Sequence, residues 1–93
     1  MAEKVRAHAI IKGRVQGVFF RMETREAAEQ RGVTGWVRNK SDGTVEAVFE
    51  GEKDSVDAVV QWCKHGPAAA KVEDVELNWQ TYDGEFTGFS VRY

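Results

Sequence analysis

The stretch "GWVRNKSDGTVEAVFEG", residues 35–51, decides the fold. Residues 44–50 alternate apolar and acidic or polar side chains, which is the period of a strand with one buried side. The apolar residues of 33–39 indicate a second strand before it. Between the two lies Ser-Asp-Gly at 41–43, a turn sequence in which Gly43 can adopt positive φ. The stretch therefore predicts an antiparallel hairpin.

Upstream of this hairpin, the sequence predicts a strand followed by a helix. Residues 5–12 alternate, with small or apolar side chains on one face and mostly polar ones on the other. From Phe20 the period becomes helical, and Gly32 supplies a stop. Five residues fall at helical spacing: Phe20, Thr24, Ala27, Ala28 and Arg31.

Downstream of the hairpin, a second helix and two more strands are expected. Asp54 or Ser55 can cap the helix, and His-Gly-Pro at 65–67 ends it. An i, i+3, i+4, i+7 stripe gives its apolar face: Val56, Val59, Val60 and Cys63. The strands are indicated by two alternating sets: Val75, Leu77 and Trp79, then Phe89, Val91 and Tyr93.

The resulting order is β-α-β-β-α-β plus a short C-terminal strand, an α+β arrangement of the ferredoxin-like, split βαβ type. The hairpin and the two long crossovers predict an antiparallel sheet with both helices on one face. At 93 residues, the whole chain, 1–93, is expected to form one domain.

Composition narrows the function classes. Thirteen basic and 15 acidic side chains give a net charge of −2, which argues against a nucleic-acid partner. A lone cysteine, Cys63, excludes an internal disulfide, and His8 and His65 lie too far apart for a metal site. The sequence shows neither a signal-peptide layout nor an apolar run near the roughly 18 residues of a membrane span. We expect a cytoplasmic protein with no membrane association, metal or cofactor.

A second dense stretch is "GRVQGVFFR", residues 13–21, at the junction of the first strand and first helix. Gly13 and Gly17 allow its backbone to curl, and a curled loop before a helix directs several N–H groups and the helix dipole to one place. Such a place binds phosphate-like anions. Arg21, in the first helical turn, is electrostatically disfavoured unless an anion binds nearby, and its planar fork suits phosphate oxygens. An ordinary tight turn with a solvated arginine is the alternative.

Neither common nucleotide-phosphate pattern is present, because the loop lacks both G-x-x-x-x-G-K-[ST] and G-x-G-x-x-G. Asn39, where the hairpin's first strand meets its turn, is on its own most simply a turn former.

Together, however, the two stretches closely resemble the signatures of the acylphosphatase family. The loop signature G-x-V-Q-G-V-x-F-R is matched by Gly13, Val15, Gln16, Gly17, Val18, Phe20 and Arg21. The other signature is matched by Gly35, Trp36, Val37, Arg38, Asn39, Gly43, Val45 and Gly51. "WCKHGP" and the final "FSVRY" are also similar to family members, so the resemblance covers essentially the whole chain.

The family hydrolyses small-molecule acyl phosphates to a carboxylate and inorganic phosphate. The resemblance implies that Arg21 and Asn39 are catalytic: Arg21 would bind the phosphate and Asn39 would orient the attacking water. It also implies a backbone cradle of N–H groups from Gln16, Gly17, Val18, Phe19, Phe20 and Arg21. Inorganic phosphate or sulfate would compete for this cradle, and the protein would act as a monomer. Whether Arg92 or the C-terminal carboxylate supports Arg21 is left open.

Other interpretations of the sequence have less support. Cys63 on an apolar stripe favours core packing over nucleophilic catalysis, and His8 and His65 favour surface positions. RNA-recognition domains share the expected fold, but their aromatic strand motif is absent and the charge is negative. A non-catalytic acyl-phosphate or carbamoyl-phosphate binding domain is the remaining alternative to the enzyme.

Overall fold

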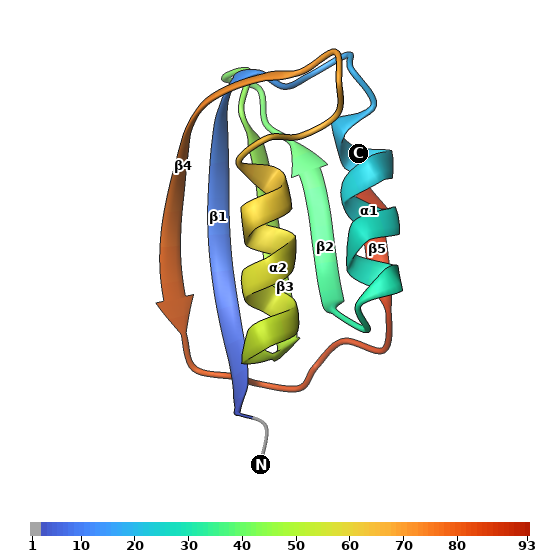
Figure 1. The fold of residues 1–93 in the computed structure, drawn as a ribbon, viewed down its shortest axis with the longest axis vertical. Helices are drawn as coiled ribbons and strands as arrows, with labels where there is room; N and C mark the ends of the chain where they lie inside the picture. Colours follow the sequence, from blue (N-terminus) through green and yellow to red (C-terminus); the bar gives the residue numbers. More distant parts are fainter. Residues whose placement is uncertain (1–2) are drawn as a thin grey trace.

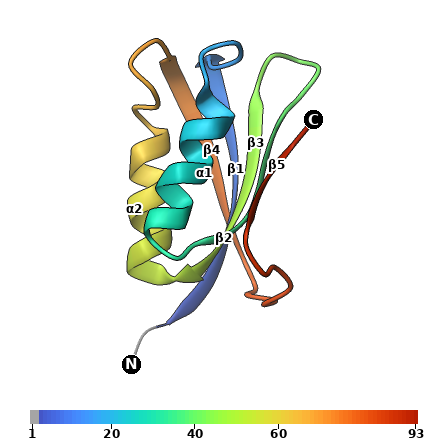
Figure 2. The same ribbon diagram turned by 90° about the vertical axis from the view of Figure 1, so that its right-hand side faces the viewer.

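The computed structural model describes residues 3–93, which form two layers. The elements in chain order are β1 (Lys4–Arg14), α1 (Phe20–Gln30), β2 (Thr34–Asn39), β3 (Val45–Glu52), α2 (Lys53–Cys63), β4 (Lys71–Gln80) and β5 (Phe89–Arg92). The strands make one sheet in the order β4-β1-β3-β2-β5 (Figure 1). Both helices cover the same face of this sheet, as Figure 2 shows edge-on. The ferredoxin-like arrangement expected from the sequence is confirmed.

The expectation of an all-antiparallel sheet is wrong for the last strand, which pairs parallel to β2. The chain leaves β4 at one edge, crosses the end of the sheet through residues 81–88, and turns back along the opposite edge (Figure 1). Because β4 and β2 run in opposite directions, this reversal gives β5 the direction of β2. The sheet is therefore mixed.

The core lies between the sheet and the two helices. Strand alternation supplies one side, since Ala7, Ala9 and Ile11 of β1 belong to the core cluster and are fully buried. They pair in register with the equally buried side chains of β3: Phe49, Ala47 and Val45. The expected stripe of α2 is buried throughout. In α1, Phe20, Thr24 and Ala28 are buried, Ala27 is half-buried, and Arg31 is exposed at the C-cap.

Two local expectations need correction. Helix α2 begins at Lys53, before either expected cap, because β3 continues into it without a loop and the Lys53 N–H bonds the carbonyl of Glu3 at 2.8 Å. Gly13 belongs to an irregularity of β1, where the register with β4 shifts. A Cβ at Gly13 would lie 2.2 Å from the carbonyl oxygen of Lys71, so this glycine permits close strand approach.

A buried carboxylate holds the 81–88 crossover against the sheet face that the helices leave open. Glu50 is fully buried and accepts hydrogen bonds from the N–H groups of Asp83 at 2.8 Å and Gly84 at 3.1 Å. Arg6 Nη1 also contacts it at 3.2 Å. Charge-assisted bonds to backbone N–H groups are strong when solvent is excluded. This anchor directs the crossover toward β5 and thereby fixes where the last residues of the chain lie.

Candidate active site

The loop between β1 and α1 has a left-handed backbone at two positions. Gly17 has φ 75°, and Phe19, which is the N-cap of α1, has φ 64°. The side chains of Val15, Val18 and Phe20 point into the core and are almost fully buried. Left-handed residues alternating with others turn successive N–H groups toward one side and form an anion-binding concavity. The inward valines and phenylalanine keep this backbone in place.

The N–H groups of this loop are free to bind a ligand. Within residues 3–93, none of the N–H groups of residues 16–19 donates to a backbone oxygen. The first turn of a helix also leaves its N–H groups without intrahelical partners, and Phe20 and Arg21 occupy that turn of α1. These donors lie at the positive end of the helix dipole.

Arg21 is held at this place by the C-terminal end of the chain. Its Nη1 donates to the carbonyl oxygen of Arg92 at 3.1 Å, and its guanidinium carbon lies 4.6 Å from the ring centroid of Tyr93. The support that the sequence leaves open thus comes from a main-chain carbonyl and an aromatic ring. Among residues 3–93, Arg21 forms no salt bridge to a carboxylate.

Asn39 is the last residue of β2, paired with Val45 and half-buried. It does not build the turn that follows: the Asp42 carboxylate accepts from Thr44 N–H at 3.0 Å and from Thr44 Oγ1 at 2.6 Å. The backbone of Lys40 closes the turn with Thr44. In the part of the chain that the structure describes, the Asn39 amide has no hydrogen-bond partner and is not enclosed. Its donor and acceptor are therefore available to a ligand or water.

The side chain of Gln16 ties the loop to this turn. Its Nε2 donates to the carbonyl oxygens of Lys40 at 2.7 Å and Thr44 at 2.9 Å. Because Lys40 directly follows Asn39, these two bonds fix the distance between the loop and the strand end that carries the asparagine. From the sequence only the backbone of Gln16 was expected to contribute, and this side-chain contact was missed. The available signal was a long amide directly before Gly17, and such a side chain has many uses.

A pocket of about 300 Å³ joins these parts. Gly17 and Arg21 line it from the loop and α1, and Asn39 lines it from β2. The chain end closes it with Val91 and Tyr93. Residues from four segments of the chain thus meet at one opening, and Arg21 is the only charged side chain among those that line it. The pocket can hold an anion beside an unengaged amide.

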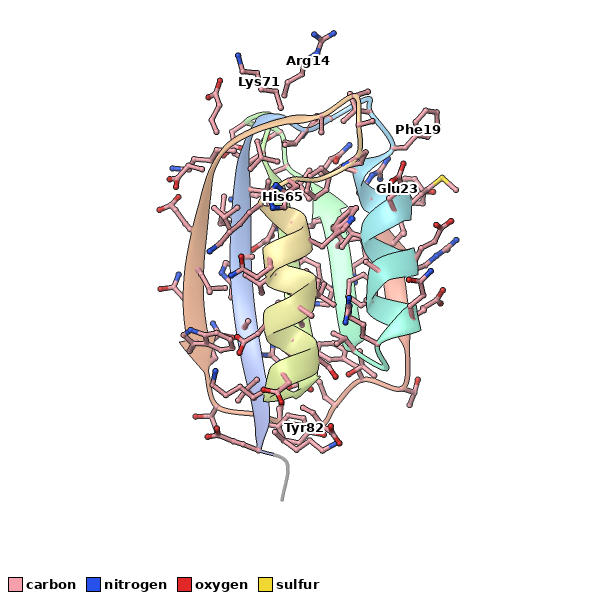
Figure 3. The ribbon with its side chains drawn as sticks, in the orientation of Figure 1. Arg14, Phe19, Glu23, His65, Lys71 and Tyr82 are labelled. Atoms are coloured by element: carbon pink, nitrogen blue, oxygen red, sulfur yellow. The ribbon has the colours of Figure 1, made fainter. Side chains whose placement is uncertain are left out.

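The remaining candidates lie elsewhere. Cys63 is fully buried, and burial raises the pKa of its thiol to about 12 despite a hydrogen bond with Thr24. His8 lies on the open face of the sheet with Nε2 2.7 Å from Glu46 Oε2. Figure 3 shows His65 at the end of α2, and it does not line the pocket. These three residues take no part in the site.

Residues 3–93 contain neither a cluster of metal ligands nor a membrane-spanning helix. No three His, Cys, Asp or Glu side chains gather closely enough to hold a metal ion. Neither helix has the length and apolar content needed to cross a lipid bilayer.

Comparison with known proteins assigns the family. The sequence model of the acylphosphatase family matches residues 7–91. An acylphosphatase of Pyrobaculum islandicum is 58% identical over 90 residues, covering 96% of this chain and 95% of its own. One from Pelotomaculum thermopropionicum is 53% identical, covering 97% and 98%. The structure of an acylphosphatase from Coxiella burnetii superposes with a TM-score of 0.91 at 39% identity, covering 96% of this chain and 93% of that one. The chain therefore belongs to the acylphosphatase family, whose enzymes hydrolyse acyl phosphates.

Proposed function

We propose that the chain hydrolyses acyl phosphates by in-line attack of a water molecule that Asn39 positions on a phosphate held by Arg21 and the backbone N–H groups of residues 16–21. The observation that carries this proposal is the meeting of three elements at one pocket. The same opening is bordered by a loop whose left-handed residues expose its N–H groups, by an arginine without a carboxylate partner, and by an asparagine amide without a hydrogen-bond partner. An anion in the loop would lie between the guanidinium and the amide.

The chemistry needs little more than position and charge. The water oxygen bonds to phosphorus while the bond from phosphorus to the acyl oxygen breaks, and the electron pair leaves with the carboxylate. A carboxylate is a good leaving group, so no strong general acid is required. The proton of the water passes to a phosphate oxygen of the substrate. Arg21 and the N–H donors neutralise the phosphoryl oxygens, and Asn39 aligns the nucleophile.

Two variants test the division of roles between the catalytic residues. Arg21→Ala should lose phosphate binding and turnover together, because the phosphate is charged before and during reaction. Asn39→Ala should keep phosphate affinity within a few-fold, because Asn39 contacts the nucleophile. We expect kcat to fall by roughly 10²–10³-fold in each, as for a lost transition-state donor. Release of inorganic phosphate from acetyl phosphate gives kcat, and calorimetry gives phosphate affinity.

Matched controls exist on the same molecule. Arg31 is exposed at the end of α1 and Asn78 is exposed on β4, so Arg31→Ala and Asn78→Ala should keep full activity. An active Asn39→Ala would remove its role in positioning water. An Asn39→Ala that no longer binds phosphate would make the residue part of the cradle.

The same assays decide the remaining parts of the proposal. A non-catalytic binding domain would bind phosphate in the calorimeter without releasing it from acetyl phosphate. Turnover should persist in excess chelator, since the mechanism uses no metal or cofactor. Phosphate and sulfate should compete with substrate. We further propose that the enzyme is cytoplasmic and that it works as a monomer formed by one domain. One chain supplies every residue that the proposed mechanism uses, which supports the monomer.

A further inference from the structure

We propose that Phe19, Met22 and Tyr93 form an apolar rim that binds the acyl group, so that the enzyme selects acyl phosphates with uncharged aromatic or long aliphatic acyl groups. The inference rests on the proposed function, because it assigns the acyl side of the same pocket.

Exposure is the first observation. Phe19 is 73% exposed, Met22 48% and Tyr93 97%, although each carries a large apolar surface. They come from the loop, the first turn of α1 and the chain end, yet all three line the pocket that holds Arg21 and Asn39. Three of the five large apolar side chains exposed in residues 3–93 therefore border one opening. Grouped exposed apolar surface beside a polar site is typical of ligand binding.

The backbone of Phe19 is the second observation. Its φ of 64° lies in the left-handed region, which asparagine and glycine adopt more readily than an aromatic residue. Burial does not compensate for this, since most of the ring is in solvent. Figure 3 shows the side chain projecting outward beyond the first turn of α1. Folding gives no reason for a phenylalanine here, whereas contact with a ligand does.

The geometry of an acyl phosphate places its acyl group at this rim. The acyl carbon is joined to phosphorus through one oxygen, so a phosphate seated in the loop must extend its acyl group through the pocket mouth. Tyr93 borders that mouth with its ring stacked near the guanidinium of Arg21 at 4.6 Å. The acyl group of a bound substrate therefore leaves the phosphate beside an aromatic ring.

The charges near the mouth specify an uncharged acyl group. Arg21 is the one charged side chain lining the pocket, and the phosphate occupies it. A second carboxylate or phosphate on the acyl group would find no further cationic side chain among the residues that line the pocket. Substrates with a terminal acid should accordingly be disfavoured.

Two phosphonates test the rim without turnover. Acetonylphosphonate and phenacylphosphonate replace the bridging oxygen of an acyl phosphate by a methylene and differ only in a methyl or a phenyl group. Calorimetry on the wild-type protein should show phenacylphosphonate binding at least about fivefold tighter, within the range for added apolar groups in a pocket. Phe19→Asn, which suits the left-handed backbone, and Met22→Gln should each lower that ratio about threefold. Trp79 lies outside the pocket and is as exposed as Met22, so Trp79→Ser should leave the ratio unchanged.

The outcomes separate the two proposals. Equal affinity of the two phosphonates for the wild type, or an unchanged ratio in both rim variants, overturns the rim while the phosphate cradle stands. If acetonylphosphonate does not bind the wild type at all, the cradle fails and the rim fails with it. Phe19→Asn should melt no lower than the wild type, because asparagine relieves the backbone, so its loss of selectivity cannot be ascribed to unfolding.

Discussion

Gln16→Met should uncouple the loop between β1 and α1 from the strand end that carries Asn39. Methionine has nearly the length of glutamine but no N–H donor. The substitution therefore removes the bonds to Lys40 O at 2.7 Å and Thr44 O at 2.9 Å with little change in volume. Both carbonyls keep a second partner, since Lys40 O accepts from Gly43 N–H and Thr44 O from Lys40 N–H. Neither oxygen is left wholly unpaired.

The size of the expected loss of stability follows from the hydrogen bonds that these two carbonyl oxygens keep. Two neutral hydrogen bonds contribute about 0.5–1 kcal/mol each when the acceptors remain satisfied, so the free energy of unfolding should fall by about 1–2 kcal/mol. For a domain of this size that lowers Tm by about 4–16 °C. Activity should fall as well, because the amide of Asn39 and the loop lose their shared anchor. The reduction should appear in kcat more than in phosphate affinity, since the loop backbone itself is intact.

Thermal unfolding by circular dichroism gives the stability change, and acetyl phosphate hydrolysis with phosphate calorimetry gives the functional one. Gln61→Met provides the control, because Gln61 is exposed on α2 and should change stability by less than about 0.5 kcal/mol. A Gln16→Met protein with wild-type Tm and kcat would refute the reasoning. One that is destabilised but fully active would keep the bonds and remove their role in catalysis.

Three further predictions concern anions and titratable groups. Phosphate or sulfate at about 100 times its Kd should stabilise the wild type by about 2.7 kcal/mol in thermal unfolding and leave Arg21→Ala unchanged; equal shifts in both would place the anion elsewhere. The buried Cys63, its pKa raised to about 12, should stay unreactive to a thiol reagent at pH 8 until the protein unfolds, and rapid native labelling would contradict its burial. Burial raises the pKa of Glu46, but hydrogen bonds from His8 and Arg38 outweigh it and lower that pKa below the ordinary 4.5. The stability from Glu46 is thus present above pH 4.5 and lost as pH falls through the folded pKa, so Glu46→Gln should destabilise at pH 7 and much less at pH 3 in urea unfolding.

The fold was largely predictable because its signals are local. The alternation in the hairpin follows from the two-residue repeat of a strand. The stripe of α2 follows from the repeat of a helix, and its four residues are buried as expected: Val56, Val59, Val60 and Cys63. The parallel pairing of β5 was not predictable in this way. It depends on the crossover anchored by Glu50, whose partners Asp83 and Gly84 lie more than thirty positions away. Nothing in the alternation of 44–50 distinguishes a solvent-facing glutamate from a buried one.

The candidate site was likewise predictable only where its signals lie within one segment of the sequence. Gly17, Arg21 and Asn39 follow from motif positions, and the structure brings them to one pocket. The side-chain role of Gln16 and the apolar rim depend on contacts between segments, which the spacing of residues does not contain. Gly13, which the sequence placed in the curl, lies instead near the end of β1, and the left-handed positions of the loop are Gly17 and Phe19. A residue as bulky as phenylalanine seldom has positive φ, so its sequence position gave no sign of this backbone.

The way Arg21 is held bears on the proposal that it binds a phosphate. A cation at the start of a helix is opposed by the helix dipole, and proteins often relieve such a charge with a carboxylate. Here the guanidinium instead contacts the carbonyl of Arg92 and the ring of Tyr93, an oxygen dipole and a π face. Both orient the group and neither neutralises it, so its full charge remains for an incoming anion. A carboxylate in the same position would occupy the fork that a phosphate needs, and the substrate would have to displace it. Support by neutral groups therefore leaves Arg21 oriented and without a charged partner. A protein of net negative charge needs such a cation if it is to bind an anion strongly.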